Sequence, residues 1–524
     1  MDSWVLDHKK RHHRFFEEMT RIPHGSFHEK GYGDYLVRFA KERSFEYKRD
    51  AIGNVMIHKP PFPGYEDHPC LGLQAHMDMV WAKTENISHD FLKDPLKLYI
   101  DHGFLKARGT TLGADDGTGV AYILAVLDDP ELKAPPIEAV FTVQEETGLG
   151  GALALKKEDI RFRRLISLDC GGGDSIYISS LAGLKGIAKR QFQWEKAQGQ
   201  GYCVRISGLK GGYSDGYKRE QANANKLGAR LVYELGRALA VHRPEESPAH
   251  HEENSSLPSG EVCCACGEKA RLLSCPSHWA GHGKSGLALR LTDVKGGGSD
   301  NKIATWCELS FTCAEDPTIL RECAKRLWAD IKKEISQPEK DVMIEWREIT
   351  PSMQMSQRCS DGILSFMYLF PCGLRHRNTE FSDIISESVN WSAVECRGKE
   401  ICLTYHLRGS SDSRIAHMQE EILLLSSCMG FECREEGSFP AWEFHDSHLL
   451  RTLQRVFKEN RGKELGLIPV QGGLECGVFA RMYPEMDIIA MGPYGYDVHT
   501  PDERLDLKSF DDIYEVFCRL LEAL

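Results

Sequence analysis

The sequence predicts an α/β protein with a long α+β insertion, and three observations support this fold class. Short apolar runs that look like buried strands alternate with helical segments before residue 184 and again after residue 436. Between these parts, half-exposed strands and amphipathic helices take their place. Apolar residues make up 41% of the 524 residues, so the chain can form a sizeable core.

The two outer parts contain the elements of one open sheet. A helix is expected over residues 8–20 and a second helix over 119–127. Buried strands are expected at 71–75, 139–143, 165–168 and 488–491. This alternation is typical of a largely parallel sheet. The simplest organisation is therefore one domain in two parts, 1–184 and 436–524.

The segment 185–435 reads as an inserted α+β domain. Its clearest strands are expected at 201–206 and 307–313, and its clearest helices at 319–335 and 415–427. The insertion is about twice as long as a single small α+β unit, which favours two such units.

Composition excludes several classes of protein. The net charge is −12, from 65 basic and 77 acidic residues, which argues against a nucleic-acid partner. No run of 18 apolar residues occurs, so no membrane partner is expected. The charged N-terminus lacks the features of a signal peptide, and we expect a reducing, cytoplasmic location. Most of the cysteines are then expected to be buried thiols, among them Cys203, Cys307, Cys313, Cys402 and Cys428.

Acidic and histidine residues follow the predicted strands. In open α/β sheets, the active site lies outside the carboxyl ends of the strands. The residues placed there are His76 and Asp78, the pair Glu145 and Glu146, Asp169, and His499, with Asp115 and Asp116 in a glycine-rich turn before the helix at 119–127. Any one of them alone could be a solvated acid at a strand end. Core packing does not explain five such segments at one edge.

These side chains suit a pair of metal ions. Carboxylates and imidazoles favour Zn²⁺, with Mn²⁺ or Co²⁺ as alternatives. Two ions about 3.5–4 Å apart can polarise a carbonyl and activate a water. Asp78 could hold the His76 imidazole in the tautomer that binds metal. Of Glu145 and Glu146, one can bind metal while the other acts as a general base.

Longer segments carry a family resemblance. They are AHMDMV, HDFLKDPLKLYIDHGFLKARGTTLGADDGTGVA, FTVQEETGLGGA, GLECGVF, and YPEMDIIAMGP followed by HTPDE. Through them the chain resembles the di-zinc metallopeptidase family that includes carnosinases, and within it the bacterial aminoacyl-histidine dipeptidases. The resemblance spans nearly the whole chain. It implies a two-part exopeptidase catalytic domain and an inserted lid domain built from two ferredoxin-like units, with a homodimer by analogy.

The resemblance also implies roles for the matching residues. The reaction would be hydrolysis of dipeptides, such as β-alanyl-histidine or a broader set, by a metal-bridged water. Glu145 would be the general base. The zinc ligands would be His76 and Asp169 for one ion, Glu146 and His499 for the other, and Asp115 between them, followed by a cis peptide bond to Asp116.

Substrate contacts are implied less strongly. Arg408 matches an arginine that holds the substrate's terminal carboxylate, although it could be an ordinary surface arginine. Asn301 matches a family asparagine but could be a turn residue. Glu475, in the GLECG stretch, is a further expected substrate contact.

Two positions depart from the family pattern. Tyr213 and Gln471 stand where the family usually has histidines. A tyrosine hydroxyl at position 213 can still donate a hydrogen bond to a developing oxyanion. The glutamine can donate one but cannot carry a proton. Both changes spare the predicted metal ligands and leave open reduced peptidase activity or a different choice of substrate.

Two alternative functions therefore stay open. One is an amidohydrolase of the same fold that acts on an acyl or modified amino acid. The other is a metal-binding protein that has lost catalysis, against which the retention of Glu145 argues. A separate excursion, residues 243–284, either forms a structural zinc knuckle or is a loop with free thiols. Its candidate ligands are Cys263, Cys266, Cys275 and His278.

Overall fold

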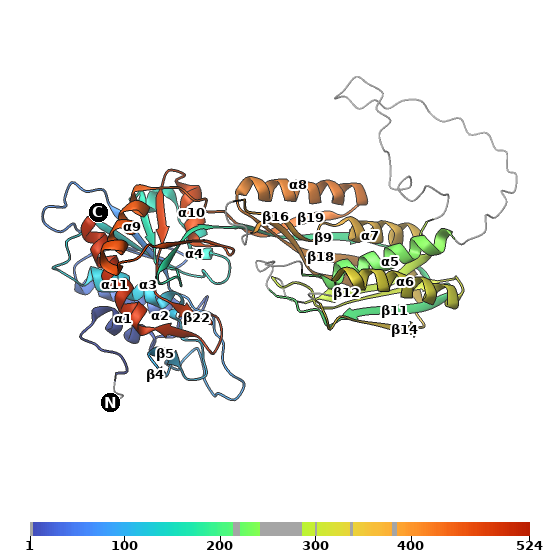
Figure 1. The fold of residues 1–524 in the computed structure, drawn as a ribbon, viewed down its shortest axis with the longest axis horizontal. Coiled ribbons are helices and arrows are strands. Elements are labelled where there is room, and N and C mark those ends of the chain that lie inside the picture. Colours follow the sequence, from blue (N-terminus) through green and yellow to red (C-terminus); the bar gives the residue numbers. More distant parts are fainter. Residues whose placement is uncertain (1–3, 213–220, 242–285, 299–300, 336–338, 380–384) are drawn as a thin grey trace, which may run out of the picture.

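The computed structural model describes residues 4–212, 221–241, 286–298, 301–335, 339–379 and 385–524. These residues form two lobes that lie side by side along the longest axis (Figure 1). One lobe contains both ends of the chain, and the other contains its middle part. Among the described helices, none combines the length and apolar character needed to cross a membrane.

An eight-stranded sheet forms the centre of the first lobe. Its four middle strands pair in parallel, as expected, and strands from both ends of the chain alternate within it. In spatial order the strands are β1 (Glu46–Arg49), β2 (Val55–Lys59), β6 (Ile137–Thr142), β3 (Leu71–His76), β7 (Arg164–Ser167), β21 (Asp487–Ala490), β8 (Ser175–Ser180) and β20 (Gly466–Val470). The prediction of a largely parallel sheet is therefore confirmed.

Helices cover this sheet and complete its core. They are α1 (Arg11–Met19), α2 (Lys30–Glu42), α3 (Ala114–Leu127), α4 (Gly150–Ala154), α9 (His448–Arg461), α10 (Glu475–Met482) and α11 (Leu507–Ala523), with a short 3-10 turn at Lys157–Asp159. A small sheet at the side contains β4 (Leu98–Asp101), β5 (Phe104–Ala107), β22 (Gly495–Tyr496) and β23 (Arg504–Asp506).

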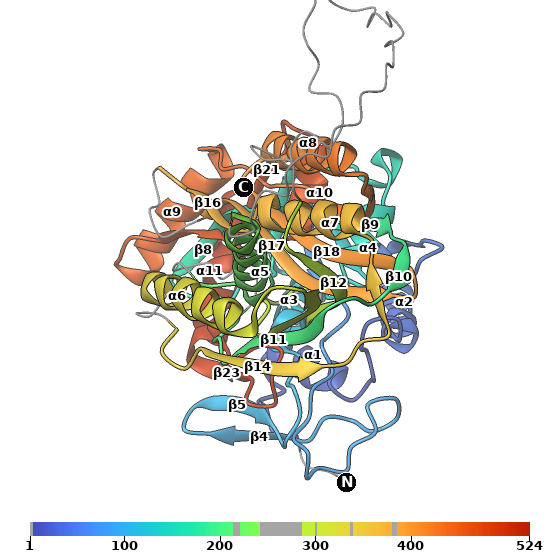
Figure 2. The same ribbon diagram turned by 90° about the vertical axis from the view of Figure 1, so that its right-hand side faces the viewer.

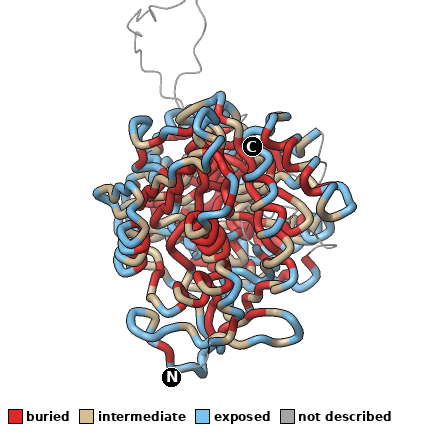
Figure 3. The backbone as a smooth tube through the Cα atoms, turned by 90° about the vertical axis from the view of Figure 1, so that its left-hand side faces the viewer, coloured by how far each residue is buried: buried red, intermediate tan, exposed pale blue. Residues whose placement is uncertain are grey.

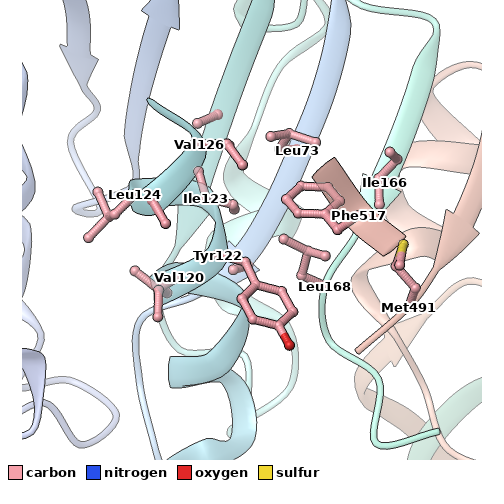
Figure 4. Packing of buried hydrophobic residues seen from close by; sticks show 14 of the residues in the cluster. Leu73, Val120, Tyr122, Ile123, Leu124, Val126, Ile166, Leu168, Met491 and Phe517 are labelled. Atoms are coloured by element: carbon pink, nitrogen blue, oxygen red, sulfur yellow. The ribbon is translucent and has the colours of Figure 1, made fainter. Parts of the chain in front are cut away.

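Helix α3 is buried on almost every side, in agreement with the continuous apolar run over its residues 120–127. Ile123 packs with Leu73 of β3 and Phe517 of α11 (Figure 4). The apolar interior of this lobe consists of this cluster and a second one that includes Phe162 and Phe479, and the exposed loops surround it (Figure 3). The rigid core holds the first turn of α3 against the end of the sheet.

The second lobe, here called the lid, is built on a nine-stranded antiparallel sheet. The strands in order are β14 (Met343–Ile349), β11 (Gln200–Ser207), β13 (Cys307–Cys313), β12 (Leu289–Gly297), β17 (Ile385–Arg397), β18 (Glu400–Gly409), β9 (Ala182–Gln191) and β19 (Glu432–Phe439), with β16 (Gly373–Arg377) paired to β17. Helices α5 (Ala224–Val241), α6 (Pro317–Ile335), α7 (Gln357–Leu369) and α8 (Asp412–Met429) pack on it (Figures 1 and 2). A two-stranded ribbon, β10 (Trp194–Lys196) with β15 (Met353–Met355), lies outside it.

The lid sheet consists of two ferredoxin-like units, as the resemblance implies. One unit runs β11–α5–β12–β13–α6–β14, and its strands lie in the order β14–β11–β13–β12. The other runs β9–α7–β17–β18–α8–β19, with the order β19–β9–β18–β17. Strands β12 and β17 join the two units edge to edge. The first unit is inserted after β9, and is therefore nested inside the second.

The chain crosses between the lobes at two neighbouring points. Ser180 and Trp442 exchange two backbone hydrogen bonds there, of 2.9 and 3.1 Å. The predicted boundaries at 184/185 and 435/436 fall inside β9 and β19, which both belong to the lid sheet. The exact division into domains stays a prediction.

The expectation of buried thiols is wrong for one cysteine. Cys203, Cys307, Cys313 and Cys402 are buried, but Cys428 is exposed. Helix α8 turns another face toward the sheet, the face of Met418, Ile422, Ser426 and Met429, and Cys428 falls on its solvent side. All cysteines in the described part of the chain are free thiols. The proposed zinc knuckle at 263–278 lies outside the described residues.

Candidate metal centre

All five residues expected as metal ligands meet at the edge of the eight-stranded sheet. One ligand atom each from His76, Asp115 and Asp169 lie within 4.8 Å of one another. The same holds for Asp115, Glu146 and His499. The two groups thus share Asp115, whose Oδ1 lies 3.1 Å from His76 Nε2 and whose Oδ2 lies 3.2 Å from His499 Nε2.

The first turn of α3 presents Asp115. Gly113 precedes the helix with φ 69°, a left-handed conformation that glycine adopts without steric cost. The peptide bond between Asp115 and Asp116 is cis, as the resemblance implies, and both residues have non-helical dihedral angles. Gly119 is needed one turn later, because a Cβ atom there would lie 2.5 Å from the Asp116 carboxylate. The glycines of this segment therefore let the turn approach the sheet closely.

Asp78 organises the loops that follow β3 and β6. Its Oδ1 accepts a hydrogen bond of 2.9 Å from the backbone N–H of Glu145. Its Oδ2 accepts bonds from the backbone N–H of Glu146 (3.2 Å) and the hydroxyl of Ser26 (2.7 Å). The ring of His76 meets the Asp78 backbone carbonyl at 2.9 Å, closer than the carboxylate at 3.6 Å. Asp78 thus orients His76 chiefly through its main chain, whereas its carboxylate fixes the two glutamates.

The loop that carries Glu145 and Glu146 begins with a residue in a strained backbone conformation. Gln144 has φ 57°, an uncommon conformation for a residue with a side chain. The Glu29 carboxylate accepts a hydrogen bond of 3.0 Å from the backbone N–H of Gln144 and so holds Gln144 in place. Such strain is concentrated at functional sites, where the surrounding structure can maintain it. Glu29 and Ser26 were not singled out in the sequence, because their partners, the backbone N–H of Gln144 and the carboxylate of Asp78, lie far away along the chain.

His499 lies in a similarly constrained loop. Its φ is 65°, and its side chain is 44% exposed, which opens the centre to solvent on that side. Four residues later, Glu503 is buried and accepts hydrogen bonds from the backbone N–H groups of Leu112 (2.7 Å), Gly113 (3.0 Å) and Ala114 (2.8 Å). Glu503 therefore joins the His499 loop to the turn that carries Asp115. Its place in HTPDE was the only signal for it in the sequence.

The electrostatics show an excess of buried negative charge. Burial raises the pKa of Glu145 well above its usual range, and the neighbouring Asp169 adds to this. Burial and the charge of Asp115 raise the pKa of Asp169 to about 7. Hydrogen bonds to Asp115 and Glu146 raise the pKa of His499 to about 11. Protons thus balance the carboxylates here, and divalent cations could replace them.

The donor set fits two metal ions. Each group offers imidazole nitrogen and carboxylate oxygen, and zinc binds both at about 2.0–2.2 Å. Three donor atoms within 4.8 Å of one another can surround one such ion. The shared Asp115 carboxylate has one oxygen for each group. The ligand roles themselves stay predictions.

The expected substrate contacts lie in different places. Arg408 of β18 packs its guanidinium 5.0 Å above the ring of Phe439, close to the crossing between the lobes. Gly473, two residues after Gln471, packs against the same ring. Asn301 is exposed in the segment between β12 and β13 of the lid. Tyr213 lies outside the described residues.

Glu475 is buried beneath the centre at the start of α10. Its Oε2 accepts hydrogen bonds of 2.6 Å from both Gln74 of β3 and Thr142 of β6. Burial raises its pKa to about 8. In this arrangement Glu475 supports the strands that carry His76 and the glutamates.

Comparisons with known proteins agree with this geometry. A family model described as peptidase family M20/M25/M40 matches residues 72–523. The cytosol non-specific dipeptidase of Escherichia coli (strain K12) is 28% identical over 519 residues, which cover 97% of this chain and 96% of that protein.

Solved structures give the same result. The aminoacylhistidine dipeptidase from Vibrio alginolyticus superposes with a TM-score of 0.80 at 27% identity, covering 98% of this chain and 96% of that one. The aminopeptidase PepT from Bacillus cereus ATCC 10987 shares the fold, with a TM-score of 0.51 at 14% identity and 99% of each chain covered. The chain therefore belongs to peptidase family M20/M25/M40 and is a hydrolase of this metallopeptidase family.

Proposed function

We propose that the chain is a dipeptidase that uses two metal ions, preferably zinc, and Glu145 as the general base. One observation carries the proposal: two groups of three donor atoms share Asp115, and Glu145 lies beside them next to a ligand candidate. The names of the Escherichia coli and Vibrio relatives support a dipeptide as the substrate. The first of these names also supports a cytoplasmic location.

Bound ions would polarise the scissile carbonyl and make a water molecule more acidic. The side chains of this chain supply the other steps. Glu145 accepts the proton of the attacking water and passes it to the leaving amine nitrogen, a role that suits a carboxylate whose pKa burial has raised. Its backbone N–H is fixed by Asp78, so the carboxylate stays aimed at the centre.

Substrate binding involves the lid. Arg408 lies close to the crossing between the lobes and offers a guanidinium fork that matches a carboxylate. Closure of the lid would bring Arg408, together with Asn301 and Tyr213, toward a dipeptide at the metal centre. Gln471 and Glu475 complete this set in our proposal, Glu475 by supporting the strands below.

A second candidate is hydrolysis of an acyl or modified amino acid. The observation that favours it is the presence of Gln471 and Tyr213 at positions where the family usually has histidines. Such a change affects the recognition of the substrate and leaves the metal ligands in place. A protein that binds metal without catalysis is the third outcome to be tested.

The test is release of free amino acids from a panel of dipeptides that includes β-alanyl-histidine and other Xaa-His substrates. It is run with Zn²⁺, with Mn²⁺ and with a chelator. We expect cleavage that requires metal, and a loss of about 10²–10⁴-fold in Glu145→Gln with the metal content unchanged. The matched variant Glu146→Gln should lose metal instead. Cleavage of acyl amino acids alone would favour the second candidate, and bound metal without any hydrolysis would refute both.

A further inference from the structure

A second cluster of metal-binding side chains lies away from this centre. His12 and His13 of α1 both turn toward Asp511 of α11. The Nε2 atoms of the two imidazoles lie 2.9 and 3.0 Å from the same oxygen, Asp511 Oδ1. One ligand atom from each residue lies within 4.8 Å of the other two. The cluster shares no residue with the metal centre and joins helices from opposite ends of the chain (Figure 1).

Aromatic packing holds the two imidazoles in place. Each histidine is only 5% exposed. The His12 ring stacks on Tyr514 at 4.2 Å, and the His13 ring stacks on Phe510 at 5.4 Å. The hydroxyl of Tyr122 donates a 2.5 Å hydrogen bond to the Phe510 carbonyl and so anchors this part of α11 to α3. The donor atoms are therefore already arranged, which reduces the cost of ordering them around an ion.

One potential ligand atom of the cluster lacks a well-aligned hydrogen bond. His13 Nε2 is buried and points to Asp511, but it makes no well-aligned hydrogen bond to any described residue. The other oxygen of the aspartate, Oδ2, accepts a 2.5 Å bond from Lys10 Nζ. Oδ1 is therefore left to the two imidazoles. An ion between the three atoms would make a bond to each of them.

We propose that His12, His13 and Asp511 form a separate zinc site that clamps α1 to α11. Two imidazoles and one carboxylate are a ligand set that suits Zn²⁺. The Asp511 side chain is 33% exposed, so an ion can enter from solvent and water can complete its coordination. Because no residue of the site belongs to the metal centre, the ion stabilises the fold and takes no part in hydrolysis.

Lys10 provides a sharp test of this geometry. Its ammonium group lies on the same carboxylate as the proposed ion, so the two positive charges repel each other. Replacing Lys10 by methionine should remove this repulsion and tighten zinc binding at the site. If Lys10 had no interaction with the site, its replacement would leave zinc binding unchanged.

The first experiment counts zinc ions per chain by mass spectrometry after loading and desalting. We expect His13→Gln to hold one ion fewer than the wild type. The matched control is His102→Gln, because the His102 side chain is 93% exposed and lies on the β4–β5 hairpin. The difference between variants does not depend on how many ions the metal centre holds. Equal zinc content in wild type and His13→Gln would overturn the proposal.

A second experiment weakens the metal centre through the ligand candidate that its two groups share, Asp115. In an Asp115→Asn background, we expect zinc to raise the thermal unfolding midpoint, and the further change Lys10→Met to lower the zinc concentration required. This second arm does not depend on whether His13→Gln folds. An unchanged midpoint in zinc, or no effect of Lys10→Met, would show that the two histidines serve only as hydrogen-bond partners of Asp511.

Discussion

The carboxylate of Asp78 accepts a hydrogen bond from the backbone N–H of Glu145, with an N···O distance of 2.9 Å. The same carboxylate also accepts bonds from the N–H of Glu146 and the hydroxyl of Ser26. Because Asp78 is buried, these hydrogen bonds compensate for the water that its charged carboxylate has lost. One aspartate thus fixes both the proposed general base and a proposed metal ligand relative to the end of β3.

Replacing Asp78 by asparagine should weaken metal binding by about 10–100-fold, because residues that orient ligands typically contribute that much. The asparagine amide would present a donor where Asp78 now has an acceptor, opposite the N–H of either Glu145 or Glu146. Metal affinity can be measured by competition with a chelating dye. Ser26→Ala is the matched control, since it removes one of the three bonds and leaves the charge. Equal affinities in the two variants would contradict this role for Asp78.

The Glu503 carboxylate should prove important for the turn that carries Asp115. It accepts bonds from three consecutive backbone N–H groups and lies 3.4 Å from a fourth, that of Asp115. Glu503→Gln keeps one acceptor oxygen but loses the charge, and a hydrogen bond to a charged group contributes about 1.5–3 kcal/mol. We expect a lower free energy of unfolding for the metal-free protein, measured in denaturant.

The exposed neighbour Asp502 offers a matched control for Glu503. Asp502→Asn removes a charge from the same loop without touching these backbone groups and should leave the unfolding free energy close to that of the wild type. If both variants unfold alike, the hydrogen bonds of Glu503 do not stabilise the turn.

The sequence predicted the parallel sheet because its buried strands are short continuous apolar runs. It also placed His76, Asp115 and Glu146 at one edge, since the carboxyl ends of parallel strands meet there. Glu503 was not predictable in its role, because its partners are backbone groups exposed only by the conformation of the turn. Cys428 was misjudged, since the apolar residues of α8 do not show which neighbours face the solvent.

The domain arrangement could be predicted only in part. The length of the insertion indicated two α+β units, and the structure contains two. Their nesting depends on which strand pairs with which, and strand pairing over long separations leaves no local signal in the sequence. The contact between His12 and Asp511 could not be predicted for the same reason, because the two ends of the chain meet only in the folded lobe.

Glu475 should make the stability of the metal-free protein depend on pH. Burial raises its pKa from 4.5 to about 8, so the folded state binds a proton that the unfolded state has released between these values. The contribution of Glu475 to stability is therefore fully present below pH 4.5 and is lost as the pH rises through about 8. Glu475→Gln cannot titrate and should flatten this part of the curve.

The measurement for Glu475 is the unfolding midpoint of both proteins from pH 4.5 to 8.5 with chelator present. Other buried carboxylates, such as Asp169, change in the same direction and remain in both proteins. The difference between the two curves isolates Glu475. A constant difference across this range would mean that Glu475 stays ionised in the folded protein, held by Gln74 and Thr142.

Arg408 should determine the affinity for substrates that end in a carboxylate. Its guanidinium packs on Phe439 beside the crossing of the lobes, where lid closure would bring it toward the metal centre. Arg408→Lys keeps the charge but loses the fork that can donate two parallel hydrogen bonds. One such bond contributes about 1.5–3 kcal/mol, which corresponds to a rise in KM of about 10–100-fold. The turnover number should change less, because the contact is present in both the ground state and the transition state.

The control for Arg408 is Arg434→Lys on β19 of the same sheet. The Arg434 side chain is 72% exposed and pairs with Glu436. Arg434→Lys makes the same chemical change in the lid without altering the crossing between the lobes. The KM of this variant should stay near the wild-type value. Dipeptide amides, which lack the terminal carboxylate, supply the second comparison. They should be poor substrates of the wild type and should lose little further in Arg408→Lys. If the variant raises KM equally for dipeptides and their amides, Arg408 supports the lid through its packing on Phe439 and does not bind the carboxylate.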